Sequence, residues 1–179
     1  MQAKNKNIFS LLYSPKGLYL DMEITREMQE AMILSLLRHD KTPSGVECSF
    51  FQFGPVGVKF YGYGKDANEK ARDAFAQQSR CYASGLAPKP GGMFAIPIKG
   101  AGTEGRCMHL HGYTTEIAIM ANREQPIDDT DREVMYSKLR NAGLPCGDLH
   151  SRNIGYVVDE ENDSFKLVPI DFGSHFGGY

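Results

Sequence analysis

Three residues in the last third of the sequence carry side-chain oxygens at a spacing suited to phosphate chemistry. Asp148 and Asn153 are five positions apart, and Asp171 follows later at the end of a strand-like run. Phosphoryl transfer requires a cation near the phosphates, oxygen ligands for Mg²⁺ and a carboxylate near the attacking hydroxyl. In a compact loop the first two side chains can face one site. We therefore expect the three residues to converge on a metal–phosphate centre.

The elements between Asn153 and Asp171 are what would bring these residues together. Two strand-like runs, residues 153–159 and 165–170, flank the polar turn at 160–164. Alternating apolar residues around such a turn are typical of a β-hairpin, whose two open ends lie side by side. The hairpin would therefore place Asn153 next to Asp171.

Hydrophobic periodicity and turn residues predict the rest of the chain. The expected elements are a hairpin at 8–22, a helix at 25–39, strands at 47–53 and 56–61, a helix at 67–84, strands at 93–98 and 107–120 with an interruption at Gly112, and a helix at 128–141. A sheet with one helix, followed by a mostly helical start to a second lobe, predicts an α+β fold. The polar composition near 121–126 predicts the boundary between a first lobe, residues 1–121 with an N-terminal helical extension, and a second lobe, residues 122–179.

The catalytic-loop motif resembles a known superfamily. The run 147–153 (Gly-Asp-Leu-His-Ser-Arg-Asn), followed by 171–173 (Asp-Phe-Gly), is similar to the catalytic loop and metal-binding turn of protein-kinase-like enzymes. Its Gly-Asp-Leu-His portion is especially similar to aminoglycoside and choline kinases. The resemblance implies that Asp148 is the catalytic base or positions the acceptor hydroxyl, and that Asn153 and Asp171 bind Mg²⁺.

A second part of the resemblance concerns the phosphates of ATP. The segment 56–59 (Val-Gly-Val-Lys) resembles the strand that supplies the phosphate-contacting lysine, here Lys59. The helix at 67–84 occupies the place of the kinase helix whose glutamate pairs with that lysine. In this sequence the residues expected to face Lys59 are glutamines, either Gln77 or Gln78.

The glycine-rich loop of the family has only a partial counterpart. Gly45 and the small residue Ser49 stand where that loop is expected, and a full Gly-x-Gly-x-x-Gly pattern is absent from this position. The resemblance covers residues 45–173 and implies a protein-kinase-like fold with a β-rich N-lobe and a truncated C-lobe. ATP and Mg²⁺ are the implied cofactors.

Two functions remain open on this reading. The first is an ATP- and Mg²⁺-dependent phosphotransferase that acts on a hydroxyl of a protein or of a small molecule. The second is a catalytically weak, pseudokinase-like binding protein that regulates or inhibits a partner. Some phage-encoded host-shutoff kinases look similarly minimal, which suggests a viral origin and the host cytoplasm as location.

Composition narrows the classes of partner. The 179-residue chain is 41% hydrophobic and has a formal net charge of −2, which argues against a broad nucleic-acid-binding face. Its four cysteines are scattered singly, which favours a reducing cytoplasm over a disulfide framework. We see no signal peptide or membrane-spanning run. A small second lobe would leave apolar surface exposed, so we expect residues 28–37 or a second copy of the chain, forming a homodimer, to cover it.

Overall fold

The computed structural model describes residue 26 and residues 48–53, 56–62, 66–98, 108–120, 126–147, 149–159 and 162–173. Several predictions lie outside these residues: the hairpin at 8–22, the helix at 25–39 apart from Arg26, the residues Gly45 and Asp148, and the cover expected from residues 28–37.

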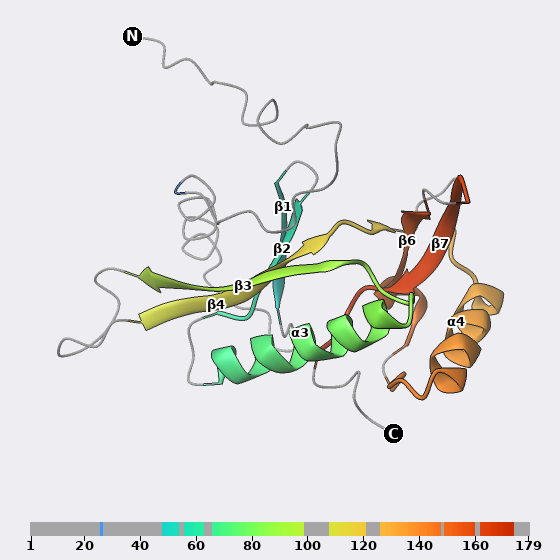
Figure 1. Cartoon of the computed structure of the whole chain (residues 1–179), viewed down its shortest axis with the longest axis horizontal. Helices are drawn as coiled ribbons and strands as arrows, with labels where there is room; N and C mark the ends of the chain where they lie inside the picture. The colour runs from blue at the N-terminus through green and yellow to red at the C-terminus, as the bar shows by residue number, and fades with distance from the viewer. Residues whose placement is uncertain are drawn as a thin grey trace, which may run out of the picture.

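The described residues form two antiparallel sheets with a helix beside each (Figure 1). The elements are β1 (Ser49–Phe53), β2 (Val56–Phe60), α3 (Ala67–Ala83), β3 (Pro90–Ile98), β4 (Met108–Glu116), β5 (Ile119–Met120), α4 (Asp129–Asn141), a short 3₁₀ turn (Ser151–Asn153), β6 (Ile154–Asp159) and β7 (Ser164–Pro169). The larger sheet has the order β1-β2-β4-β3 and the smaller β5-β6-β7. The predicted α+β class is confirmed, and no described helix is long and apolar enough to cross a membrane.

The larger sheet buries both of its faces. On one face, Val58, Phe60 and Leu110 form a cluster against which the partly buried Phe51 and Phe53 pack. The opposite face packs on α3, where a second and larger cluster extends to α4 and the smaller sheet. Because both faces are apolar, β2 is a continuous buried run rather than an alternating one.

Helix α3 ends where the sequence predicts. Gly85 has a φ of +68°, a conformation that glycine adopts without strain, and the backbone N–H of Leu86 donates to the Cys81 oxygen at 2.8 Å. The polar Gln78 is fully buried on the inner face of the helix, whereas Tyr82, near the C-terminal end, is exposed.

The predicted strand at 107–120 is two strands in two sheets. β4 continues through Gly112 without interruption. A side chain at this position would overlap the carbonyl oxygen of Lys59 and the ring of Phe94. Glycine at this position permits close approach of β2 and does not interrupt β4. After Glu116 the chain changes sheet, and β5 pairs with β6. The lobe boundary at 121 stays a prediction. β5, which precedes this boundary in the sequence, is a strand of the smaller sheet together with β6 and β7.

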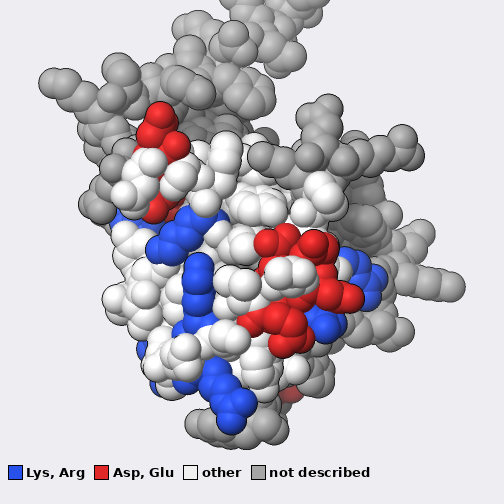
Figure 2. All heavy atoms as spheres, turned by 90° about the vertical axis from the view of Figure 1, so that its right-hand side faces the viewer, with Lys and Arg blue, Asp and Glu red and all other residues white. Residues whose placement is uncertain are grey.

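Helix α4 begins with a capping box at its acidic end. The Asp128 side chain accepts a hydrogen bond from the Asp131 backbone N–H, and the Asp131 carboxylate accepts one from the Asp128 N–H in return. Figure 2 shows the face that includes this part of the molecule, with a group of acidic side chains and basic ones spread around them. On this face the described residues form no continuous cationic surface.

Candidate functional site

A cavity of about 350 Å³ lies where the larger sheet meets the β6–β7 hairpin. Lys59, Asn153 and Asp171, three residues singled out from the sequence, all line it. The complete lining consists of Cys48, Phe50, Lys59, Pro88, Thr115, Glu116, Ala118, Met120, Arg152, Asn153, Ile170 and Asp171. The volume is within the range of about 300–1,000 Å³ that is usual for small-molecule sites.

The hairpin brings two of these residues together as its topology requires. Ile154, the first residue of β6, pairs with Pro169, the last residue of β7. Asn153 and Ile170 therefore lie side by side just outside the open end of the ladder, and the Ile170 N–H donates to the Asn153 backbone oxygen at 2.9 Å. Asp171 follows in a turn in which its carboxylate accepts the Gly173 N–H at 3.2 Å.

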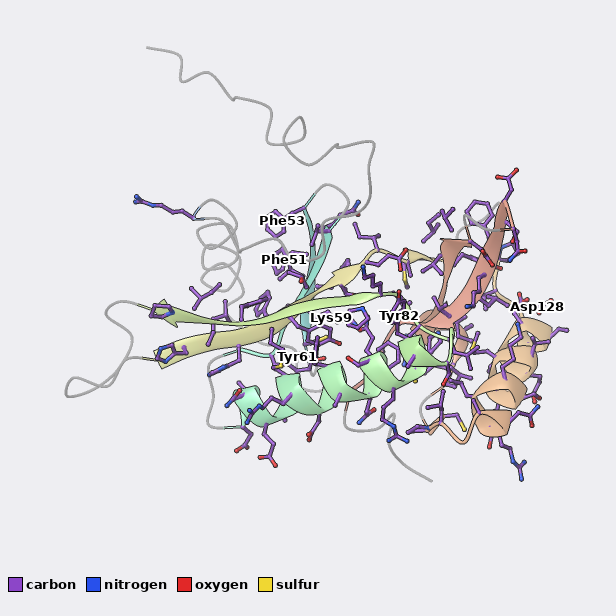
Figure 3. The ribbon with its side chains drawn as sticks, in the orientation of Figure 1. Phe51, Phe53, Lys59, Tyr61, Tyr82 and Asp128 are labelled. Atoms are coloured by element: carbon purple, nitrogen blue, oxygen red, sulfur yellow. The ribbon has the colours of Figure 1, made fainter. Side chains whose placement is uncertain are left out.

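Lys59 reaches the same cavity from β2, with a side chain only 6% exposed. Its ammonium donates a hydrogen bond to the backbone oxygen of Ile170. The ring centres of Tyr113 and Phe172 lie 5.7 and 5.1 Å from Nζ, within the range of a cation–π interaction. Lys59 and Tyr61 lie on the side of the sheet that faces α3, and Phe51 and Phe53 lie on the other side (Figure 3).

Burial dominates the protonation of this lysine. Desolvation lowers the pKa of Lys59 from its ordinary value of 10.5, while the neighbouring Cys48 and Asp171 oppose this change. The ammonium is therefore held by a carbonyl and aromatic rings, with Asp171 contributing only a smaller electrostatic effect.

Gln78 is not the hydrogen-bonding partner of Lys59 that the sequence predicted. Its amide donates to the Pro88 oxygen at 3.0 Å and to Thr115 Oγ1 at 2.6 Å, and it accepts from the Tyr113 hydroxyl at 3.0 Å. The amide oxygen, the one atom of this side chain that could accept from an ammonium, thus has the Tyr113 hydroxyl as its partner. The prediction placed Gln78 on the correct face of α3, but β4 lies between it and the lysine.

The role of Ser49 as a cofactor-binding residue stays a prediction. Ser49 is partly buried in β1 and is not among the residues that line the cavity, whereas its neighbours Cys48 and Phe50 are. Successive side chains of a strand point to opposite faces, so the site-facing residues are those on either side of Ser49.

Phe50 is a site residue that sequence reasoning missed. It pairs directly with Lys59 across the β1–β2 ladder, and its side chain is 49% exposed. A Cβ at Gly57 would come within 2.7 Å of the Phe50 ring, so the glycine provides the space in which the ring lies. The pairing register, which the two-residue spacing between β1 and β2 favours, was the signal that would have found it.

The segment from the end of β4 into β5 forms another part of the cavity lining. Glu116 and Ala118 contribute to this part, and the Glu116 side chain accepts the Lys89 N–H at 2.8 Å. Gly155 allows β6 to approach closely, because a Cβ there would lie 2.9 Å from the Ile119 oxygen. Chain spacing alone gave no indication of this part of the lining, since the β-branched residues Thr115 and Ile117 favour a strand on both sides of Glu116.

The oxygen donors fit Mg²⁺ rather than a metal that requires a complete protein ligand set. Within the described residues, no group of three or more His, Cys, Asp or Glu side chains could hold a metal ion. Mg²⁺ is commonly held by one or two protein oxygens together with substrate phosphates and water. Asn153 and Asp171, which line the same cavity, supply donors of this kind.

No protein-family profile matches the chain, and neither curated proteins nor solved structures show a significant similarity to it. The functional assignment therefore depends on the geometry of this cavity and on the resemblance of its sequence motifs.

Proposed function

We propose that this chain is an ATP- and Mg²⁺-dependent phosphotransferase of protein-kinase-like fold that acts on a hydroxyl of a protein or small molecule. The supporting observation is that Lys59, Asn153 and Asp171, which come from three separate segments, line one cavity. A buried cation next to two metal-binding oxygens is the combination that phosphoryl transfer uses.

The polar part of the cavity would hold the phosphates. Lys59 would contact phosphate oxygens, exchanging its hydrogen bond to the Ile170 carbonyl for a charge-assisted one. Asn153 and Asp171 would hold Mg²⁺, which supplies neutralisation of phosphate charge when bound. Lys59 is hydrogen-bonded to Ile170, the residue immediately before Asp171. The lysine and the metal ligands would therefore act on the same phosphate group.

The apolar part of the cavity would hold the base. Phe50, Ala118 and Met120 line it, and Ile170 lies on the hairpin side. An aromatic ring that is half exposed at a cavity is suited to stacking on a planar base. This arrangement supports a nucleotide as the ligand rather than a simple phosphate.

The transfer step follows from these positions and from the motif role of Asp148. The acceptor hydroxyl oxygen would bond to the γ-phosphorus while the bond from that phosphorus to the β–γ bridging oxygen breaks, which releases ADP. Asp148 would take the hydroxyl proton or orient the hydroxyl.

A specific observation favours the second candidate, a pseudokinase-like binding protein. The buried neutral amide of Gln78 stands on the helix where the family places a glutamate, and the Lys59 ammonium donates to a backbone oxygen. A protein of this kind would bind nucleotide without transferring phosphate.

Incubation with γ-labelled ATP and Mg²⁺, with and without a cell lysate, separates the two candidates. The enzyme is expected to label itself or a lysate component, and Asp148→Asn is expected to lower this labelling by roughly a hundredfold or more. Equal labelling by the wild type and Asp148→Asn would exclude Asp148 as the base. Nucleotide binding without any transfer or ADP release would support the binding protein.

A further inference from the structure

A small set of polar groups is buried between α3 and β4, and two of its members, Pro88 and Thr115, also line the cavity. Gln78 has no exposed surface, Tyr113 has none, and Thr115 is 2% exposed. The Gln78 amide is hydrogen-bonded to the Tyr113 hydroxyl, to Thr115 and to the Pro88 backbone oxygen. Since Tyr113 and Thr115 are two apart on β4, both project toward the helix, and one amide spans them.

This set is connected to Lys59 through the Tyr113 ring. Lys59 and Tyr113 are directly paired across the β2–β4 ladder, which explains why the lysine ammonium lies 5.7 Å from the ring centre. The ring is further fixed by an edge contact with Phe75, at 5.4 Å and 73°, and by stacking with Tyr61, at 6.2 Å and 19°. The position of α3 therefore determines the position of the ring beside the lysine.

We propose that Gln78 and Tyr113 are positioning residues for Lys59, and that they replace the helix carboxylate which would otherwise hold such a lysine. This inference rests on the proposed function only in so far as Lys59 contacts the phosphates. In this arrangement α3 acts on the ammonium through a hydrogen bond and an aromatic face, without a direct ion pair.

The arrangement requires an amide at position 78. A carboxylate has no N–H, and although the Tyr113 and Thr115 hydroxyls can each donate to it, the Pro88 carbonyl oxygen cannot. Gln78→Glu would therefore place a buried negative charge next to an acceptor that has lost its donor. The exchange that would give this chain the usual kinase residue is expected to damage it.

Thermal unfolding tests the requirement for the amide. Gln78→Glu is expected to lower Tm by about 5 °C or more, and Gln78→Met is expected to lower it by a smaller amount. The control is Asn68→Asp, the same chemical change at an exposed position of the same helix, which is expected to leave Tm nearly unchanged. A Gln78→Glu protein as stable as the wild type would overturn the inference.

NMR of lysine-labelled protein tests whether Gln78 positions the Lys59 side chain. If Gln78 only stabilised the fold, its substitution would leave the Lys59 signal unchanged. The Lys59 ε-CH₂ signal, assigned from Lys59→Met, carries the ring-current shifts of its aromatic neighbours. Gln78→Met is expected to move this signal because the ring loses its anchor, and Tyr113→Leu is expected to move it most. Asn68→Asp is expected to leave it in place.

The outcomes separate this inference from the proposed function. A folded Gln78→Met protein with an unmoved Lys59 signal would overturn the positioning role, and this variant decides the question if Tyr113→Leu does not fold. Both measurements use the protein without nucleotide. Failure to bind ATP would therefore sink the proposed function and leave these results intact.

Discussion

The two sides of the cavity hold their functional groups in different ways. On the sheet side, Lys59 is buried and held by a carbonyl and two aromatic rings. On the hairpin side, Asn153 and Asp171 are partly exposed at the end of a two-stranded ladder. The sheet side needs tertiary packing to place its cation, whereas the hairpin side needs only one correct local register. The two sides should therefore respond differently to substitution.

The largest expected difference lies in how each side contributes to nucleotide affinity. Lys59→Met and Asp171→Asn are each expected to weaken Mg²⁺-ATP binding by about 10- to 100-fold, since each loses a charged interaction. Lys59→Met should weaken binding with or without Mg²⁺, because it removes a phosphate contact. Asp171→Asn should abolish mainly the gain in affinity that Mg²⁺ provides.

Calorimetry with and without Mg²⁺ measures both effects. If the two variants lose the same affinity under both conditions, then the division between a phosphate cation and a metal ligand is wrong. Phe51→Ala, on the face of the sheet opposite Lys59, is a control for general damage to the β1–β2 ladder.

The dependence of the sheet side on close packing can be tested at a glycine. Gly112→Ala is expected to lower the free energy of unfolding by about 1–3 kcal/mol or more, because the added methyl overlaps the Lys59 carbonyl and the Phe94 ring. Gly92→Ala, where a Cβ meets nothing within 4 Å, is the matched control. Denaturant titration should show a large difference between the two, and equal stability would refute the close approach of β2 and β4.

The pH dependence distinguishes a buried lysine from an exposed one. Because burial lowers the pKa of Lys59 from 10.5, ATP affinity is expected to fall with rising pH before an exposed lysine would titrate. Between the lowered pKa and 10.5 the unfolded chain binds the extra proton, so this residue makes stability increase with pH in that range. Lys59→Met should show neither change. An affinity that is constant up to pH 10.5 would contradict the burial of the ammonium.

The smallest expected effect concerns the base. Phe50→Ala is expected to weaken ATP binding by about 3- to 10-fold, the size of one stacking contact, and Phe50→Trp to retain the affinity. Binding of inorganic triphosphate should be the same in all three proteins. Equal losses for ATP and triphosphate would mean that Phe50 supports the strand and does not contact the base.

The elements that depend on local pattern could be predicted from the sequence. Helices α3 and α4 and the β6–β7 hairpin lie within one or two residues of the expected bounds, because capping residues and turns define them. The approach of Asn153 to Asp171 followed from the hairpin alone. Their roles as metal ligands, and that of Asp148 as the base, stay predictions.

The partners of Gln78 could not be predicted, because they depend on which β4 residues lie beneath α3. The sequence placed either Gln77 or Gln78 on the inward side of the helix, but it did not show that Tyr113 and Thr115 contact Gln78 before Lys59 does. The change of sheet after Glu116 was hidden for a similar reason. The β-branched Thr115 and Ile117 favour a strand on both sides of it, and periodicity does not show which strand a residue pairs with.

Calorimetric titration of the wild-type protein with ATP in the presence of Mg²⁺, and again with Mg²⁺ chelated, tests the central claim most directly. If Lys59, Asn153 and Asp171 act together, ATP binding is measurable and weakens when the metal is removed. The Lys59→Met substitution then weakens this binding both with and without Mg²⁺. The absence of binding at millimolar ATP, which corresponds to a free energy weaker than about −4 kcal/mol, would contradict the claim.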